Sequence, residues 1–199
     1  MFTMPRALPR QFTMPIVAVL ARLGVTPNML TIAQVAGGFI AAGVIAGGEL
    51  LWGSVIMLAA ATLDALDGTL ARATGKATRF GGVFDSVMDR IFEGAVLGGI
   101  LYYYLERGAK EESMLVFVSV VGSLCVSYVR ARAQAEGVEL YDGLFTRGVR
   151  IILLAAGLAV DQLRIVLWIM AIMTVITALH RLFVVWLKLR VEEKGRSGR

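Results

Sequence analysis

The sequence contains little charge and almost no cysteine. Asp, Glu, Lys and Arg make up 18% of its 199 residues, whereas soluble globular proteins have about 25%. Cys125 is the only cysteine, which excludes a disulfide-stabilised scaffold. The 22 glycines have no repeating period, which excludes a collagen-like protein. Because so few charges are available to form a soluble basic surface, we expect no nucleic-acid partner.

Most residues of the sequence are apolar. Hydrophobic residues make up 57% of the chain and the mean hydropathy is +0.73, which predicts an integral membrane protein. A bilayer crossing takes about 20 residues. The charge-free runs reach this length when the charges at their ends are included. They then predict an all-α fold with six transmembrane helices, over residues 28–48, 50–73, 79–106, 111–136, 146–161 and 164–189.

The six helices form one predicted catalytic domain over residues 26–190, with a short segment on either side. Within the N-terminal segment 1–25, residues 11–24 are apolar on one side and are flanked by Arg10 and Arg22, which predicts an amphipathic helix lying in the membrane interface. The segment 191–199 is polar and is predicted to be a disordered cytoplasmic tail.

The basic residues indicate the orientation. Most lie on one side of the predicted helices, as in the loop that holds Arg72, Lys76 and Arg79, and few lie in the opposite loops. The positive-inside rule therefore places both termini in the cytoplasm. We expect a multi-pass membrane protein whose functional site faces the cytoplasm.

Two pairs of aspartates stand out within the predicted helices. Asp64 and Asp67 are three residues apart and share a helix face, as do Asp85 and Asp89, which are four apart. A rise of about 1.5 Å per residue from the intervening loop brings both pairs to a similar depth. The pattern predicts that four carboxylates converge in the inner leaflet.

A carboxylate at this depth costs about 2.5 kcal/mol or more unless it is compensated. Two divalent cations would balance the four charges, and oxygen ligands favour magnesium, manganese or calcium over zinc. The alternative is that some aspartates form ion pairs with Arg72, Arg79 or Arg90. Gly68 allows a phosphate or sugar to approach the helix backbone closely, and Arg72 is suited to bind that phosphate.

Three further arginines lie near the cytoplasmic ends of predicted helices: Arg130, Arg150 and Arg181. Several guanidinium groups at a similar depth predict a pocket for a phosphorylated substrate. The alternative is that these arginines only anchor the helices on the cytoplasmic side, which explains Arg181 poorly because it lies about two turns inside its helix.

One run of residues resembles a family signature. It reads Asp64-x2-Asp67-Gly68-x2-Ala71-Arg72-x8-Gly81-x3-Asp85-x3-Asp89, which is similar to the signature of the CDP-alcohol phosphotransferases. The six predicted helices and the Thr26-Pro27-Asn28 entry to the first of them also fit that family. The resemblance implies a membrane enzyme of phospholipid synthesis, acting as a homodimer. It would transfer a phosphatidyl group from CDP-diacylglycerol to an alcohol and release CMP.

The resemblance also implies residue roles. Asp64, Asp67, Asp85 and Asp89 would hold two Mg²⁺ ions, or Mn²⁺, and Asp89 would in addition be the general base for the acceptor hydroxyl. Cys125 and His180 would have no role in the reaction. The positions similar to those that bind the CDP-lipid are Thr26, Pro27, Asn28, Met29, Gly68, Ala71, Arg72 and Thr78.

Within the family, residues 127–133 (SYVRARA) and 180–182 (HRL) resemble the phosphatidylinositol-phosphate synthases of actinobacteria and their archaeal relatives. This implies inositol 1-phosphate as the soluble acceptor, held by Arg130, Arg150 and Arg181. Gln134 and Thr146 replace acidic residues of that subgroup, so glycerol 3-phosphate is the alternative acceptor.

Two other classes of membrane protein also use several carboxylates. An intramembrane prenyltransferase normally needs more helices than this length permits. A divalent-cation transporter does not need Gly68, Arg72 or a one-sided basic pocket. Magnesium-dependent release of CMP distinguishes the transferase from both.

Overall fold

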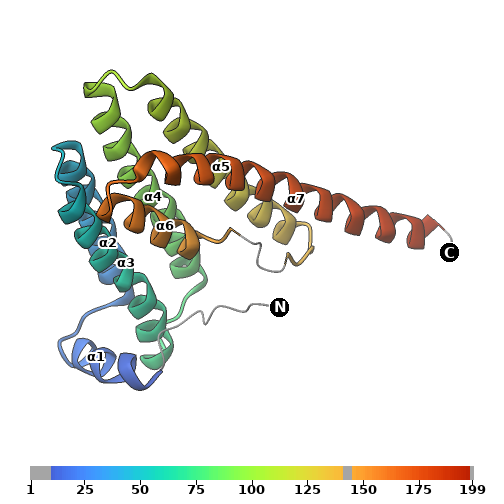
Figure 1. Ribbon diagram of the computed structural model, residues 1–199. Coiled ribbons are helices and arrows are strands. Elements are labelled where there is room, and N and C mark those ends of the chain that lie inside the picture. Colours follow the sequence, from blue (N-terminus) through green and yellow to red (C-terminus); the bar gives the residue numbers. More distant parts are fainter. Residues whose placement is uncertain (1–9, 141–144, 198–199) are drawn as a thin grey trace. The chain divides into compact units, whose positions relative to one another are not determined.

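The computed structural model describes residues 10–140 and 145–197, and the regular structure in these ranges is helical (Figure 1). The helices are α1 (Arg10–Arg22), α2 (Pro27–Ala46), α3 (Leu50–Ala73), α4 (Arg79–Glu106), α5 (Lys110–Ala135), α6 (Arg147–Ala159) and α7 (Leu163–Ser197). The predicted all-α class is therefore confirmed for the described residues.

Four of the described helices are long and apolar enough to cross a membrane: α2, α3, α5 and part of α7. The other two predicted crossings do not meet this standard. α4 carries Asp85, Asp89, Arg90 and Glu93 within it, and α6 has only 13 residues, which span about 20 Å. The count of six crossings stays a prediction.

Local sequence explains where the helices of the first half begin and end. Thr26 caps α2 by accepting a hydrogen bond from the Met29 amide, and Pro27 occupies the first turn, where its missing N–H costs nothing. Gly48 and Gly75 follow α2 and α3 with positive φ angles of 96° and 67°, a conformation that glycine adopts without strain.

The last helix is longer than the sequence indicated. α7 continues to Ser197, so much of the segment 191–199 that was predicted to be disordered is helical. Its polar composition suggested a free tail. However, extending a formed helix needs no new nucleation, and Glu and Lys are good helix formers.

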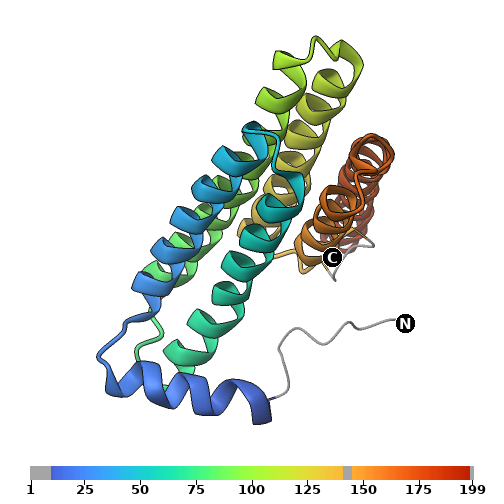
Figure 2. The same cartoon turned by 60° about the vertical axis from the view of Figure 1, so that its left-hand side comes forward.

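The chain divides into two compact units, one up to Ile100 and one from Leu101. The prediction of a single domain over 26–190 did not anticipate this division. In the first unit, α2 and α3 run antiparallel side by side (Figures 1 and 2). Ile45, Met57 and Phe92, from α2, α3 and α4, are fully buried in its core.

Helix α2 approaches both of its neighbours at small residues. A methyl group added at Gly37 would lie 2.7 Å from the Ala60 Cβ on α3, and one added at Gly38 would lie 2.6 Å from the Phe92 ring on α4. At Gly99 of α4 the added carbon would lie 2.6 Å from the Ala42 Cα. Small residues let membrane helices pack this closely, so these glycines fix the position of α2.

Replacing Gly99 with alanine should lower the apparent Tm of the purified protein by about 5 °C, because the new methyl group overlaps main-chain atoms that cannot rotate away. Gly98→Ala is the matched control, since nothing lies within 4 Å of a Cβ at that position. Thermal unfolding in detergent measures both. Equal Tm values for the two variants would contradict the close packing of α4 on α2.

Helix α1 lies across the end of α3 (Figure 2). Its Val17 is buried against Leu30, Leu66 and Leu70. Apolar side chains on its other faces remain exposed, among them Met14, Ile16 and Val19, and Leu23 directly after the helix is exposed as well. The helix is thus attached to the first unit by one face and presents further apolar surface.

In the second unit, α5 and α6 each pack on α7. A Cβ at Gly122 of α5 would lie 2.6 Å from the Thr174 Cβ, and one at Gly157 of α6 would lie 2.6 Å from Val166 Cγ2. Near the start of α7, Arg164 forms an ion pair with Glu111 at 2.7 Å, and this ties the beginnings of α5 and α7 together.

Candidate functional site

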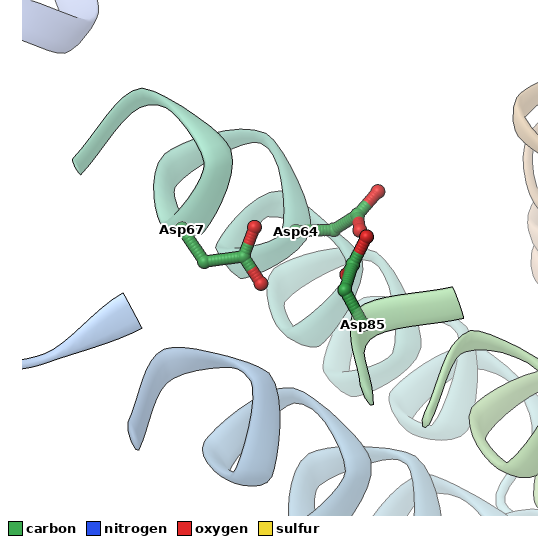
Figure 3. A group of neighbouring side chains, drawn as sticks. All are labelled: Asp64, Asp67 and Asp85. Atoms are coloured by element: carbon green, nitrogen blue, oxygen red, sulfur yellow. The ribbon is translucent and has the colours of Figure 1, made fainter. Parts of the chain in front are cut away.

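Three aspartates meet between α3 and α4. Asp64 and Asp67 come from α3 and Asp85 comes from α4, and each offers a carboxylate oxygen within 4.8 Å of the others (Figure 3). Asp67 is buried, with 5% of its surface exposed, and the other two are half-buried. The predicted approach of the two helical motifs is therefore observed for three of the four carboxylates.

The donor set fits a hard divalent cation. Adjacent oxygens bound to one octahedral Mg²⁺ lie about 3 Å apart and opposite ones about 4.2 Å apart, and Ca²⁺ tolerates longer separations. The aspartate oxygens lie within 4.8 Å of one another, so the side chains would move closer together to bind one ion. Three acidic oxygens without nitrogen or sulfur ligands favour Mg²⁺ or Mn²⁺ over Zn²⁺.

Asp89 does not belong to this close group, which differs from the predicted convergence of four carboxylates. It lies one turn beyond Asp85 on α4, which shifts it about 6 Å along the helix. Asp89 is half-buried, and its Oδ1 accepts a hydrogen bond of 3.4 Å from Gln34 Nε2 of α2.

Helix α2 contributes a second contact that the sequence analysis missed. The Thr31 hydroxyl donates a hydrogen bond of 2.7 Å to Asp67 Oδ2, and both residues are buried. Thr31 and Gln34 lie three residues apart, on one face of α2. Polar residues three apart in an otherwise apolar run are a signal for such a face, but they do not identify the partner on another helix.

The residues expected to bind the CDP-lipid lie in the first unit, near the ends of α2, α3 and α4. The Thr78 hydroxyl accepts a hydrogen bond of 2.9 Å from the Gly81 amide at the start of α4. A Cβ at Gly81 would lie 4.0 Å from Asn28 Oδ1, so these three residues are neighbours. Asn28 and Met29 are exposed at the start of α2.

The Arg72 guanidinium lies over Gly68, one turn away on α3. Its Nη1 atom would lie 3.4 Å from a Cβ at Gly68, which is van der Waals contact. Arg72 is exposed, whereas Gly68 and Ala71 are half-buried. This end of α3 therefore presents a cation beside bare backbone, an arrangement suited to a phosphate.

Two of the three arginines expected to bind the acceptor are buried in the second unit, with 2% of Arg150 and 5% of Arg181 exposed. Arg150 Nη1 donates to the Phe145 carbonyl at 3.2 Å, and Arg181 Nη1 donates to the Val126 carbonyl at 2.8 Å. The charge of Arg181 is repelled by those of Arg130 and Arg150. Arg130 and Arg150 thus both lie within electrostatic reach of Arg181.

Within the described ranges, the buried Nε of Arg181 makes no hydrogen bond. A buried N–H without a partner is costly, and an anion would supply the acceptor that the Arg181 Nε needs.

The model of the CDP-alcohol phosphatidyltransferase family matches residues 24–192. The phosphatidylinositol phosphate synthase of Mycobacterium marinum is 35% identical over 196 residues, covering 91% of this chain and 82% of that protein. The archaetidylinositol phosphate synthase of Pyrococcus horikoshii is 38% identical over 170 residues, covering 82% of this chain and 85% of that protein.

Solved structures are also similar. The crystal structure of Mycobacterium tuberculosis phosphatidylinositol phosphate synthase with CDP-DAG bound has a TM-score of 0.84 and 32% identity, covering 88% of this chain and 94% of that one. The complex of the same synthase with manganese and citrate has a TM-score of 0.81 and 32% identity, over 87% and 88% of the two chains.

Proposed function

This chain belongs to the CDP-alcohol phosphatidyltransferase family, and from that premise we propose that it transfers a phosphatidyl group from CDP-diacylglycerol to inositol 1-phosphate. The products are CMP and phosphatidylinositol phosphate. The single observation that carries the proposal is the group of Asp64, Asp67 and Asp85, whose spacing is that of the family signature and whose oxygens lie within 4.8 Å of one another.

The aspartates would hold the metal. Asp64, Asp67 and Asp85, together with Asp89, would bind two divalent cations, Mg²⁺ or Mn²⁺, in agreement with the manganese complex of the similar synthase. When bound, such ions neutralise a pyrophosphate and polarise its phosphorus. Thr26, Asn28, Gly68, Arg72 and Thr78, with Pro27, Met29 and Ala71, would bind the CDP portion of the lipid.

Asp89 would act as the general base. The acceptor hydroxyl oxygen attacks the phosphorus that carries the diacylglycerol group, and the bond from that phosphorus to the CMP oxygen breaks. The hydroxyl proton passes to the Asp89 carboxylate. The reaction needs no nucleophilic side chain, because the acceptor oxygen attacks directly.

The arginines would bind the acceptor phosphate. Arg150 and Arg181 are buried and the latter has an unused N–H, so a dianionic phosphate would gain charge-assisted hydrogen bonds there. Glycerol 3-phosphate is the second candidate acceptor, because Gln134 and Thr146 stand where the inositol-phosphate enzymes carry acidic residues.

The membrane arrangement is part of the same proposal. α2 to α7 would cross the membrane six times, with the site on the cytoplasmic side of a prokaryotic membrane. α1, which presents Met14, Ile16 and Val19 beside its buried Val17, would lie in the interface. The enzyme would act as a homodimer.

The test is CMP release from CDP-diacylglycerol and inositol 1-phosphate by the purified protein. Removing divalent cations with a chelator should stop turnover and lower the apparent Tm by about 5–10 °C. A ligand at 100 times its Kd adds about 2.7 kcal/mol of stability to the native state, which a protein of this size reports as such a shift.

Adding back Mg²⁺ or Mn²⁺ in excess should restore both turnover and Tm, which distinguishes metal loss from damage. CMP release that persists in excess chelator would contradict the metal-dependent reaction. Cation binding without any CMP release would instead favour the transporter.

A further inference from the structure

We propose that Thr31 and Gln34 of α2 are positioning residues, which hold the carboxylates of Asp67 and Asp89 in the orientation that metal binding needs. This inference rests on the proposed function for the roles of the two aspartates. The contacts themselves are hydrogen bonds between side chains 36 and 55 residues apart in the sequence.

The Thr31 hydroxyl has one proton and two acceptors within reach. Asp67 Oδ2 lies at 2.7 Å and the Pro27 carbonyl oxygen at 3.2 Å. The shorter distance and the negative charge direct the proton to Asp67. Thr31 is 2% exposed and Asp67 is 5% exposed, so little water competes for this bond. One oxygen of Asp67 is thereby fixed from the α2 side.

Gln34 is the second donor. Its side chain is fully buried, and its Nε2 lies 3.4 Å from Asp89 Oδ1, at the long end for a hydrogen bond. A carboxylate only accepts hydrogen bonds, so the amide must present its NH₂ group to Asp89. The amide oxygen then accepts no hydrogen bond within the described residues.

A buried amide with an unsatisfied oxygen costs free energy that leucine, of similar size, would avoid. Packing therefore does not explain a glutamine at position 34. The contact with Asp89 does explain it, because the amide donates a hydrogen bond to this half-buried carboxylate.

The helix that carries both donors is itself firmly placed. α2 meets α3 where Gly37 contacts Ala60, and it meets α4 where Gly38 contacts Phe92. Asp67 belongs to α3 and Asp89 to α4. One helix therefore sets the orientation of a carboxylate on each of the two helices that form the metal site.

Residues that orient metal ligands through hydrogen bonds typically contribute 10–100-fold to metal affinity. The Kd for Mn²⁺, measured from the electron paramagnetic resonance signal of the free ion, should therefore rise about tenfold or more in Thr31→Val and in Gln34→Leu. Thr31→Ser keeps the hydroxyl and should stay within about twofold of the unmodified protein.

Thr174→Val is the matched control. Thr174 is a fully buried threonine, and among the described residues its hydroxyl donates only to carbonyl oxygens of its own helix. Loss of this hydroxyl should therefore leave the Mn²⁺ affinity unchanged. The Tm of each variant, measured with and without Mn²⁺, separates a general loss of folding from a loss of metal binding.

Wild-type Mn²⁺ affinity in Thr31→Val and Gln34→Leu overturns the proposal, and wild-type affinity in only one of them removes that residue from it. Equal shifts of the Mn²⁺ Kd in Thr31→Ser and Thr31→Val, or a shift in Thr174→Val as large as either, also overturn it.

Mn²⁺ binding does not require turnover. If the unmodified protein binds Mn²⁺ but releases no CMP, the proposed function fails while the positioning role is still tested.

Discussion

The variant Asp89→Asn should lose transfer activity by about 10²–10⁴-fold, the usual contribution of a general base. An amide cannot take up the acceptor proton at neutral pH. It also weakens any metal contact that the Asp89 carboxylate makes, whereas the close group of Asp64, Asp67 and Asp85 is left intact. Binding of CDP-diacylglycerol should therefore persist in part. CMP release measures the loss, and calorimetry with the nucleotide lipid measures the retained binding.

Asp161→Asn is the matched control for this change. Asp161 is exposed after α6 and has a positive φ of 54°, which asparagine also tolerates. The control should keep normal turnover and stability. If Asp89→Asn kept more than about a tenth of normal turnover, Asp89 would not be the base.

Arg181→Ala should raise the KM for inositol 1-phosphate by about tenfold or more. The variant loses a charge-assisted contact worth roughly 1.5–3 kcal/mol, and 1.4 kcal/mol corresponds to a factor of ten. The KM for CDP-diacylglycerol should change less than about twofold. Arg181→Lys keeps the charge without the planar fork and should give an intermediate KM.

Arg190→Ala is the control on the same helix, because Arg190 is exposed and its guanidinium lies 5.0 Å from the centre of the Trp186 ring. Its acceptor KM should be normal. Phosphorylated and free inositol, and glycerol 3-phosphate, should be compared in each variant. If the enzyme turned over free inositol as fast as inositol 1-phosphate, the arginines would not form a phosphate-binding pocket. A preference for glycerol 3-phosphate would change only the identity of the acceptor.

The fold follows from the sequence where local signals are strong. The predicted helices 50–73 and 79–106 have the bounds of α3 and α4, because charges and glycines mark their ends. The prediction was wrong for the tail, where polar composition says little about whether an existing helix continues to Ser197.

The candidate site was predictable in part for a similar reason. Helical spacing and depth were enough to bring Asp64 and Asp67 toward Asp85. They did not reveal that Asp89 falls outside the close group, nor that Thr31 and Gln34 reach the carboxylates. Those contacts depend on how α2 is rotated about its axis against α3 and α4. Packing at the glycines of α2 decides this rotation, and no single segment of the sequence encodes it.

The buried face of α2 also restricts how this protein can diverge in evolution. Successive turns of that face carry Thr31, Gln34 and Gly38, followed by Ala41 and Ala42, and all five are buried. Each is either a donor to a carboxylate or a residue small enough for close helix contact. Neutral drift in α2 is therefore confined to its outward side, where Ile32, Phe39 and Ile40 are exposed and need only remain apolar.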